Sequence, residues 1–231
     1  EEEILATEVL ATSVRGHGCF YIVARADAGA AQLAIYRLIF EQYRPKVYPS
    51  FPMTHVEGLP RVTAEIDAFR RVMAEHFITF DPGDVDEKRL LSMAEQAARQ
   101  GRRRFVVRVH GRSVELDVDE VLEVAGDIDG QIYARDFKLI DQAELTIAFI
   151  PQLPAGPDGH ARPAISSGVE RELQHAHEAA KEVFVIWRPQ ADPSPFITQT
   201  ANRVFRSTDE AVRFFLTNNY VPPPPSGRLF E

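Results

Sequence analysis

Two acidic residues, Asp136 and Glu172, stand on either side of one apolar segment of the chain. The spacing of apolar residues predicts a helix over 132–143, a buried strand over 145–151 and a second helix over 167–181. Because the two helices flank the same strand, their carboxylates can converge at one edge of a sheet. A carboxylate pair can supply a nucleophile and a proton donor or acceptor. For each carboxylate taken alone, the simpler interpretation is a solvent-exposed residue on a helix face.

The entrance of the second helix carries small polar residues. Ser166, Ser167 and Gly168 precede its first apolar position. Hydroxyls and free backbone N–H groups at a helix start can hold an anion. These three residues are therefore candidate substrate-binding residues beside the two candidate catalytic carboxylates.

Several common catalytic and cofactor-binding motifs are absent from the sequence. It contains no G-x-x-x-x-G-K-[ST] and no G-x-S-x-G, and the Gly-His-Gly at 16–18 lacks the third glycine of a dinucleotide fingerprint. Cys19 lies in a predicted buried strand, where a packed thiol is expected. His175 and His177 are two apart on a helix and point to different faces. We therefore expect neither a cofactor nor a metal.

The wider pattern alternates helices and strands, which predicts an α/β fold. We expect a doubly wound parallel sheet, Rossmann-like or flavodoxin-like, with a β-hairpin insertion around His110-Gly111. The basic run 102–104 before the hairpin is expected to be a solvated strand edge, with a phosphate patch as the alternative. The other predicted strands cover 46–51, 77–82 and 183–187, and the other predicted helices cover 61–76, 86–100 and 208–218.

Three segments are expected along the chain. Residues 1–45 are predicted to form a helix, a strand and a helix (4–14, 19–25 and 29–42). This segment is small for an independent domain, and the chain begins with Glu, so we expect the end of an upstream domain. Residues 46–218 are expected to form the α/β domain, and 219–231 a Pro-rich tail.

Composition is that of a globular protein. The 231 residues are 45% hydrophobic and 26% charged, with a formal net charge of -8 and a pI of about 5.4. An acidic chain is poorly suited to a nucleic-acid backbone, so no such polymer is expected as a partner. One cysteine, no visible signal peptide and no long apolar run predict a cytoplasmic protein that contacts no membrane.

The order and spacing of these segments resemble the nucleoside 2-deoxyribosyltransferase superfamily, which includes 2′-deoxynucleoside 5′-monophosphate N-glycosidases. The segment KVYPSF is similar to the family's first strand, DFKLIDQAELTIAFIP to its aspartate-bearing helix and next strand, and SSGVERELQHA to its glycine loop and nucleophile helix. The resemblance covers about residues 46–215. The chain departs from the family at Gln174, where a glycine is usual, and in insertions at 101–125 and 154–165.

The resemblance implies cleavage of an N-glycosidic bond in a nucleoside or nucleoside 5′-monophosphate, by hydrolysis or by deoxyribosyl transfer. Glu172 matches the nucleophile, which forms a covalent glycosyl-enzyme. Asp136 is implied to protonate or orient the leaving base, and Tyr48 to hold Glu172 or the sugar. Ser166 stands where the monophosphate hydrolases carry a serine that meets the 5′-phosphate. Ser194 resembles a residue donated across a dimer interface, so a homodimer or higher homo-oligomer is also implied.

Two functions of other classes stay open at this point. The chain could be a catalytically silent nucleotide sensor within a larger protein, or a structural interaction domain that uses its Pro-rich tail. Glu172 separates these possibilities. An enzyme would lose turnover but not its fold on Glu172→Gln, whereas a sensor would bind nucleotide and never release a base.

Overall fold

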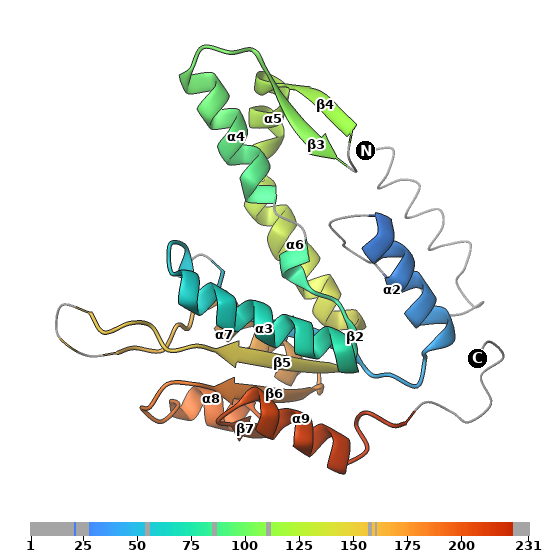
Figure 1. Ribbon diagram of the computed structural model, residues 1–231. Helices are drawn as coiled ribbons and strands as arrows, with labels where there is room; N and C mark the ends of the chain where they lie inside the picture. Colours follow the sequence, from blue (N-terminus) through green and yellow to red (C-terminus); the bar gives the residue numbers. More distant parts are fainter. Residues whose placement is uncertain are drawn as a thin grey trace.

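The centre of the computed structural model is a five-stranded sheet in the order β2-β1-β5-β6-β7 (Figure 1). Tyr21 and residues 28–53, 56–84, 87–109, 112–156, 159 and 161–223 are described. All neighbouring strands in the sheet pair in parallel. Numbered by sheet strands alone, this order is 2-1-3-4-5, the flavodoxin-like order, so the predicted doubly wound fold is confirmed. The strands are β1 (Lys46–Ser50), β2 (Ile78–Thr79), β5 (Leu145–Ile150), β6 (Glu182–Trp187) and β7 (Arg203–Phe205).

Helices cover both faces of the sheet (Figure 1). On one face lie α3 (Pro60–His76) and α9 (Thr208–Thr217), which share a core with alternate strand residues. On the other face lie α6 (Ile128–Gln142) and α7 (Ser167–Glu178), whose core includes Tyr48. Successive side chains of a strand point to opposite faces, so residues two apart on β1 meet the same helices.

A smaller unit is inserted between β2 and α6, and Figure 1 shows it projecting away from the sheet. Its strands pair antiparallel, as predicted for the hairpin. It has its own small core around Ala94, Phe105 and Val118. Its elements are α4 (Glu87–Arg99), β3 (Arg104–Val109), β4 (Arg112–Asp117) and α5 (Val118–Ala125). The short helix η2 (Pro82–Asp84), which follows β2, contacts β1 of the main sheet.

The sequence pattern predicted the hairpin and did not predict helix α5, which directly follows its second strand. The strand ends at Asp117, whose side chain accepts hydrogen bonds from the backbone N–H groups of Asp119 and Glu120. An aspartate in this position caps a helix, and Val118 and Val121 then follow at helical spacing. The sequence pattern also did not predict α8 (Pro195–Thr200) or β7, which are too short to show a clear period.

The ends of the chain are described only in part. Helix α2 (Ala28–Phe40) agrees with the predicted helix over 29–42. The helix and strand predicted over 4–14 and 19–25 lie outside the described residues, apart from Tyr21. Near the C-terminus, the Tyr220 hydroxyl donates to Glu182 at 2.6 Å. Among the helices of the described ranges, none has the length and apolar character needed to cross a bilayer.

Candidate active site

Helices α6 and α7 lie next to each other and bring Asp136 and Glu172 to one cavity of about 270 Å³. In the chain, α6 comes directly before β5 and α7 follows it, as the sequence predicts, and both helices pack on the same face of the sheet. The sheet order reverses between β1 and β5, and doubly wound proteins bind ligands at such a switch point. The cavity is lined by Ile132, Tyr133, Asp136, Phe137, Ser167, Gly168, Arg171 and Glu172.

Glu172 is held by a hydroxyl from the end of β1. The Ser50 Oγ donates to its Oε2 at 2.6 Å, and Ser50 is fully buried. Helix α7 packs Val169 and Leu173 into the core, which fixes the direction in which Glu172 leaves the helix. The carboxylate is therefore placed at the junction of α7, α6 and β1.

Burial raises the pKa of Glu172 from its ordinary 4.5 to about 7. The hydrogen bond from Ser50 opposes this rise, the nearby negative charge of Asp136 adds to it, and the nearby Tyr48 hydroxyl opposes it. Burial disfavours the charged form of a carboxyl group, and a hydroxyl donor favours it. A carboxyl group that titrates near neutral pH is suited to acid–base or nucleophilic work.

Tyr48 is fully buried and lies near enough to Glu172 and Asp136 to feel both charges. Burial raises its pKa well above 10.0, and the negative charges of Glu172 and Asp136 raise it further. Its hydroxyl is near Glu172, yet it makes no hydrogen bond of normal geometry within the described residues. Buried hydroxyls normally have partners, so this one is available to Glu172 after a small movement, or to a bound ligand.

Asp136 is buried and paired with its neighbour Arg135. The guanidinium donates through Nε and Nη2 to the same oxygen, Oδ1, at 3.1 and 2.9 Å. The candidate site therefore holds two carboxylates in different surroundings, one beside a cation and one beside hydroxyls.

The predicted anion-binding residues lie at the start of α7, except one. Ser167 and Gly168 line the cavity. Ser166 is the N-cap, and its Oγ accepts from the N–H of Val169 at 3.2 Å. Ser194 is at the N-cap position of α8 and is exposed; it does not line this cavity.

Three residues of the site were not predicted from the sequence. Ser50 is two residues after Tyr48 on β1, so the period of a strand could have placed it on the same face. Arg135 precedes Asp136 directly, and its pairing depends on how the side chain turns, which spacing does not show. Arg171 is exposed at the cavity rim, one residue before Glu172, and the Tyr133 hydroxyl raises its pKa.

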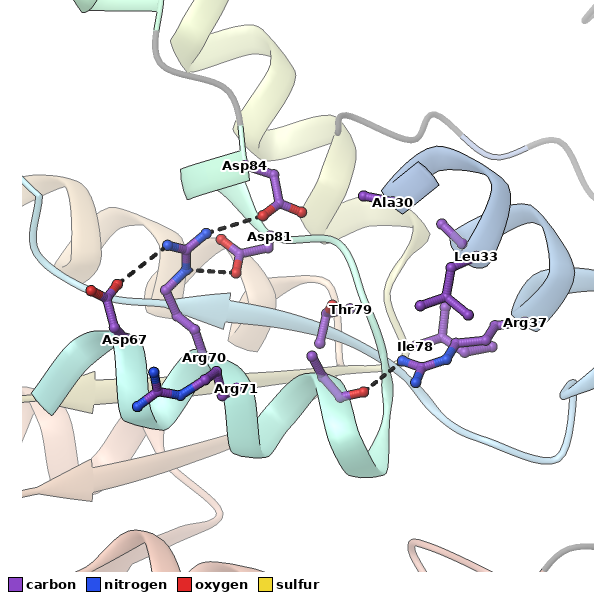
Figure 2. A pocket seen from close by; sticks show the side chains of 12 residues that line it. Ala30, Leu33, Arg37, Asp67, Arg70, Arg71, Ile78, Thr79, Asp81 and Asp84 are labelled. Atoms are coloured by element: carbon purple, nitrogen blue, oxygen red, sulfur yellow. Dashed lines mark hydrogen bonds and ion pairs between the residues drawn. The ribbon is translucent and has the colours of Figure 1, made fainter. Parts of the chain in front are cut away.

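A larger cavity of about 450 Å³ lies between α2 and α3 (Figure 2). Its three carboxylates are all paired with one arginine: Arg70 forms ion pairs with Asp67, Asp81 and Asp84. Because these carboxylates already have a cationic partner, they are less suited to acid–base or nucleophilic work than Glu172. Within the described part of the chain, no three His, Cys, Asp or Glu side chains are grouped so as to hold a metal ion.

Comparison with protein-family models and with curated proteins gives no match. Among solved structures, the chain is similar to the CMP N-glycosidase BcmB of Clostridium botulinum, at 20% identity and a TM-score of 0.29. The match covers 42% of this chain and 86% of that one. A TM-score of this size carries no weight for the function of the present chain, so the function is inferred from its own residues.

Proposed function

We propose that the protein cleaves the N-glycosidic bond of nucleoside 5′-monophosphates or nucleosides, as an N-glycosidase or a 2-deoxyribosyltransferase. The observation that carries this proposal is the meeting of Glu172 and Asp136 at one cavity, with Ser50 bonded to Glu172. The resemblance of the segments that bear these residues to the deoxyribosyltransferase superfamily supports the same chemistry.

In the proposed first step, ionised Glu172 attacks C1′ of the sugar. One carboxylate oxygen bonds to C1′ while the C1′–N bond breaks, and the electron pair of that bond leaves with the base nitrogen. The base takes up a proton, from Asp136 or from water. In the second step, water or a second base attacks C1′, and Glu172 departs as a carboxylate. When water attacks, its proton passes to solvent.

A phosphate on the substrate would lie at the start of α7. Ser167 and Gly168 contribute backbone N–H groups at the positive end of the helix dipole, and Arg171 adds a cation at the rim. A nucleoside 5′-monophosphate is therefore the favoured substrate over the bare nucleoside.

Base release measured by chromatography tests the proposal. Wild type is incubated with ribo- and deoxyribonucleoside 5′-monophosphates and with their nucleosides, beside Glu172→Gln. Glu170→Gln is the matched control, because Glu170 lies on the same helix and is exposed. We expect release by wild type and by Glu170→Gln, and none by Glu172→Gln. A nucleotide that raises the Tm of wild type without any base release would indicate a sensor instead.

A covalent glycosyl-enzyme is the second readout. Acid-quenched wild type should carry the added mass of the sugar phosphate on the peptide that contains Glu172. If base is released but no adduct forms under single-turnover conditions, water attacks the sugar directly and the nucleophile assignment is wrong.

We also propose that the active protein is a homodimer or higher homo-oligomer. Near Ser194, Phe196 is 85% exposed, the largest exposure among the large apolar side chains that the structure describes. Helix α8 contacts α7, so an interface at α8 would lie near the cavity.

A further inference from the structure

The Arg135 side chain is largely buried at the candidate site and hydrogen-bonded there, unlike the side chain of a typical surface arginine. Its side chain is 16% exposed and that of Asp136 is 8% exposed. Both donated hydrogen bonds reach one oxygen of the carboxylate, which favours its ionised form and limits its rotation.

The Arg135 guanidinium also contacts the turn that follows β2. Nη2 of Arg135 also donates to the carbonyl oxygen of Pro82, at 3.4 Å. Pro82 begins η2, which follows Asp81 at the end of the sheet. Asp81 accepts from the N–H of Gly83 at 2.8 Å, which closes the turn.

Helix α3 holds this turn in place, and Figure 2 shows the contact. Nε of Arg70 donates to Asp81 at 2.8 Å and its Nη2 to Asp84 at 3.1 Å. The packing is tight at Gly83, where a Cβ would lie 3.0 Å from the Phe51 ring and 3.1 Å from the Arg70 guanidinium, so both side chains would have to shift slightly. The Pro82 carbonyl that accepts from Arg135 is therefore held in place by Arg70 of α3 and by Phe51, the residue that follows β1.

Glu172 has a different environment, since its hydrogen bond comes from the neutral hydroxyl of Ser50. A guanidinium in contact adds a full positive charge to its hydrogen bonds, so it favours an ionised carboxylate more than a neutral hydroxyl does. The two acids thus differ in the partners that the structure describes: Asp136 has a guanidinium, and Glu172 has a hydroxyl.

We propose that Arg135 is a positioning residue, which keeps Asp136 ionised and directs its carboxylate into the cavity, so that Asp136 accepts a hydrogen bond from the substrate instead of donating a proton. This inference rests on the proposed function for the identity of the substrate. The leaving base then takes its proton from water.

A double-mutant cycle tests this role with Arg135→Gln, Asp136→Asn and the double variant, using a nucleotide that wild type cleaves. We expect Arg135→Gln to lower kcat at least tenfold and to change KM less than threefold. In the Asp136→Asn background, the same change should lower kcat less than twofold, because Arg135 acts through Asp136. Arg135→Lys keeps the positive charge but loses the paired N–H donors of the guanidinium, so it should retain part of the kcat that Arg135→Gln loses.

Arg104→Gln is the matched control, since Arg104 is 64% exposed and its ion pair with Glu115 lies in the inserted hairpin. It should match wild type. An Arg135→Gln variant as active as this control would overturn the proposal. Losses that multiply in the double variant would also overturn it, because Arg135 would then act independently of Asp136.

The Tm of the same four proteins separates this inference from the proposed function. If wild type releases no base from any nucleotide, the proposed function fails, but the Tm values still test the pairing of Arg135 with Asp136. Arg135→Gln should lower the Tm by several degrees in the wild-type background and by less than half as much beside Asp136→Asn. Equal losses in both backgrounds would contradict the pairing itself.

Discussion

Replacing Glu172 by Gln should stabilise the protein above neutral pH, and the gain should depend on pH. In the folded protein the pKa of Glu172 is about 7, against an ordinary value of 4.5. A raised carboxyl pKa means that the fold favours the protonated form. The stability that Glu172 contributes is therefore complete below pH 4.5 and is lost as the pH rises through about 7.

The size of the effect follows from that shift. Each pKa unit corresponds to about 1.4 kcal/mol, so the whole shift is worth roughly 3 kcal/mol. Part of Glu172 reaches the cavity, where solvent reduces the effect. As the pH rises from 5 to 8.5, we expect the free energy of unfolding of wild type to fall by about 2 kcal/mol relative to that of Glu172→Gln.

Urea unfolding at several pH values, followed by circular dichroism, measures this difference. Subtracting Glu172→Gln from wild type removes the titration of all groups that the two proteins share. Glu170→Gln is again the control, since its exposed side chain should give a difference near zero at every pH. A free-energy difference between wild type and Glu172→Gln that stays constant from pH 5 to pH 8.5 would refute the reasoning, whatever the activity of the protein.

Three further outcomes are expected. The kcat/KM of wild type should rise with pH through about 7, because attack on the sugar needs ionised Glu172. Ser50→Ala should move the midpoint of this rise to higher pH, because the hydrogen bond that it removes lowers the pKa of Glu172. An unmoved midpoint would exclude Glu172 as the titrating group. Tyr48→Phe should leave the free energy of unfolding in urea unchanged or raise it by up to about 1 kcal/mol, since the buried hydroxyl makes no hydrogen bond of normal geometry within the described residues; a loss of more than about 1 kcal/mol would show that the hydroxyl is already bonded in the folded protein. Phe196→Glu should convert an oligomer into monomers in sedimentation experiments without lowering the Tm, because the ring is 85% exposed within one chain; a wild type that is already monomeric would contradict the proposed assembly.

Much of the sheet could be predicted because its strands give strong signals. Leu145–Ile150 and Glu182–Trp187 are almost wholly buried, and such strands appear in a sequence as continuous apolar runs. The fold then forces the helices on either side of β5 to be neighbours. That topological constraint is why Asp136 and Glu172 could be paired before their distance was known.

The contacts that give these carboxylates their properties could not be predicted in the same way. Ser50 is one of many serines, and its role depends on the direction in which α7 presents Glu172. Helix α5 was missed because the same short segment fits a strand by alternation and a helix by the cap at Asp117. Short elements and side-chain directions are decided by packing, which leaves no period in the sequence.

The partition of charge between the two carboxylates follows from the layout of the fold. Asp136 lies on α6 facing the turn after β2, where Arg135 can reach both its own neighbour and the Pro82 carbonyl. Glu172 lies on α7 facing the end of β1, where it meets hydroxyls. Burial is the main cause of the raised pKa of Glu172, and the negative charge of Asp136 adds to it. The layout of the fold therefore gives Asp136 a guanidinium and Glu172 a hydroxyl as a partner, and the double-mutant cycle at Arg135 and Asp136 measures whether that difference affects turnover.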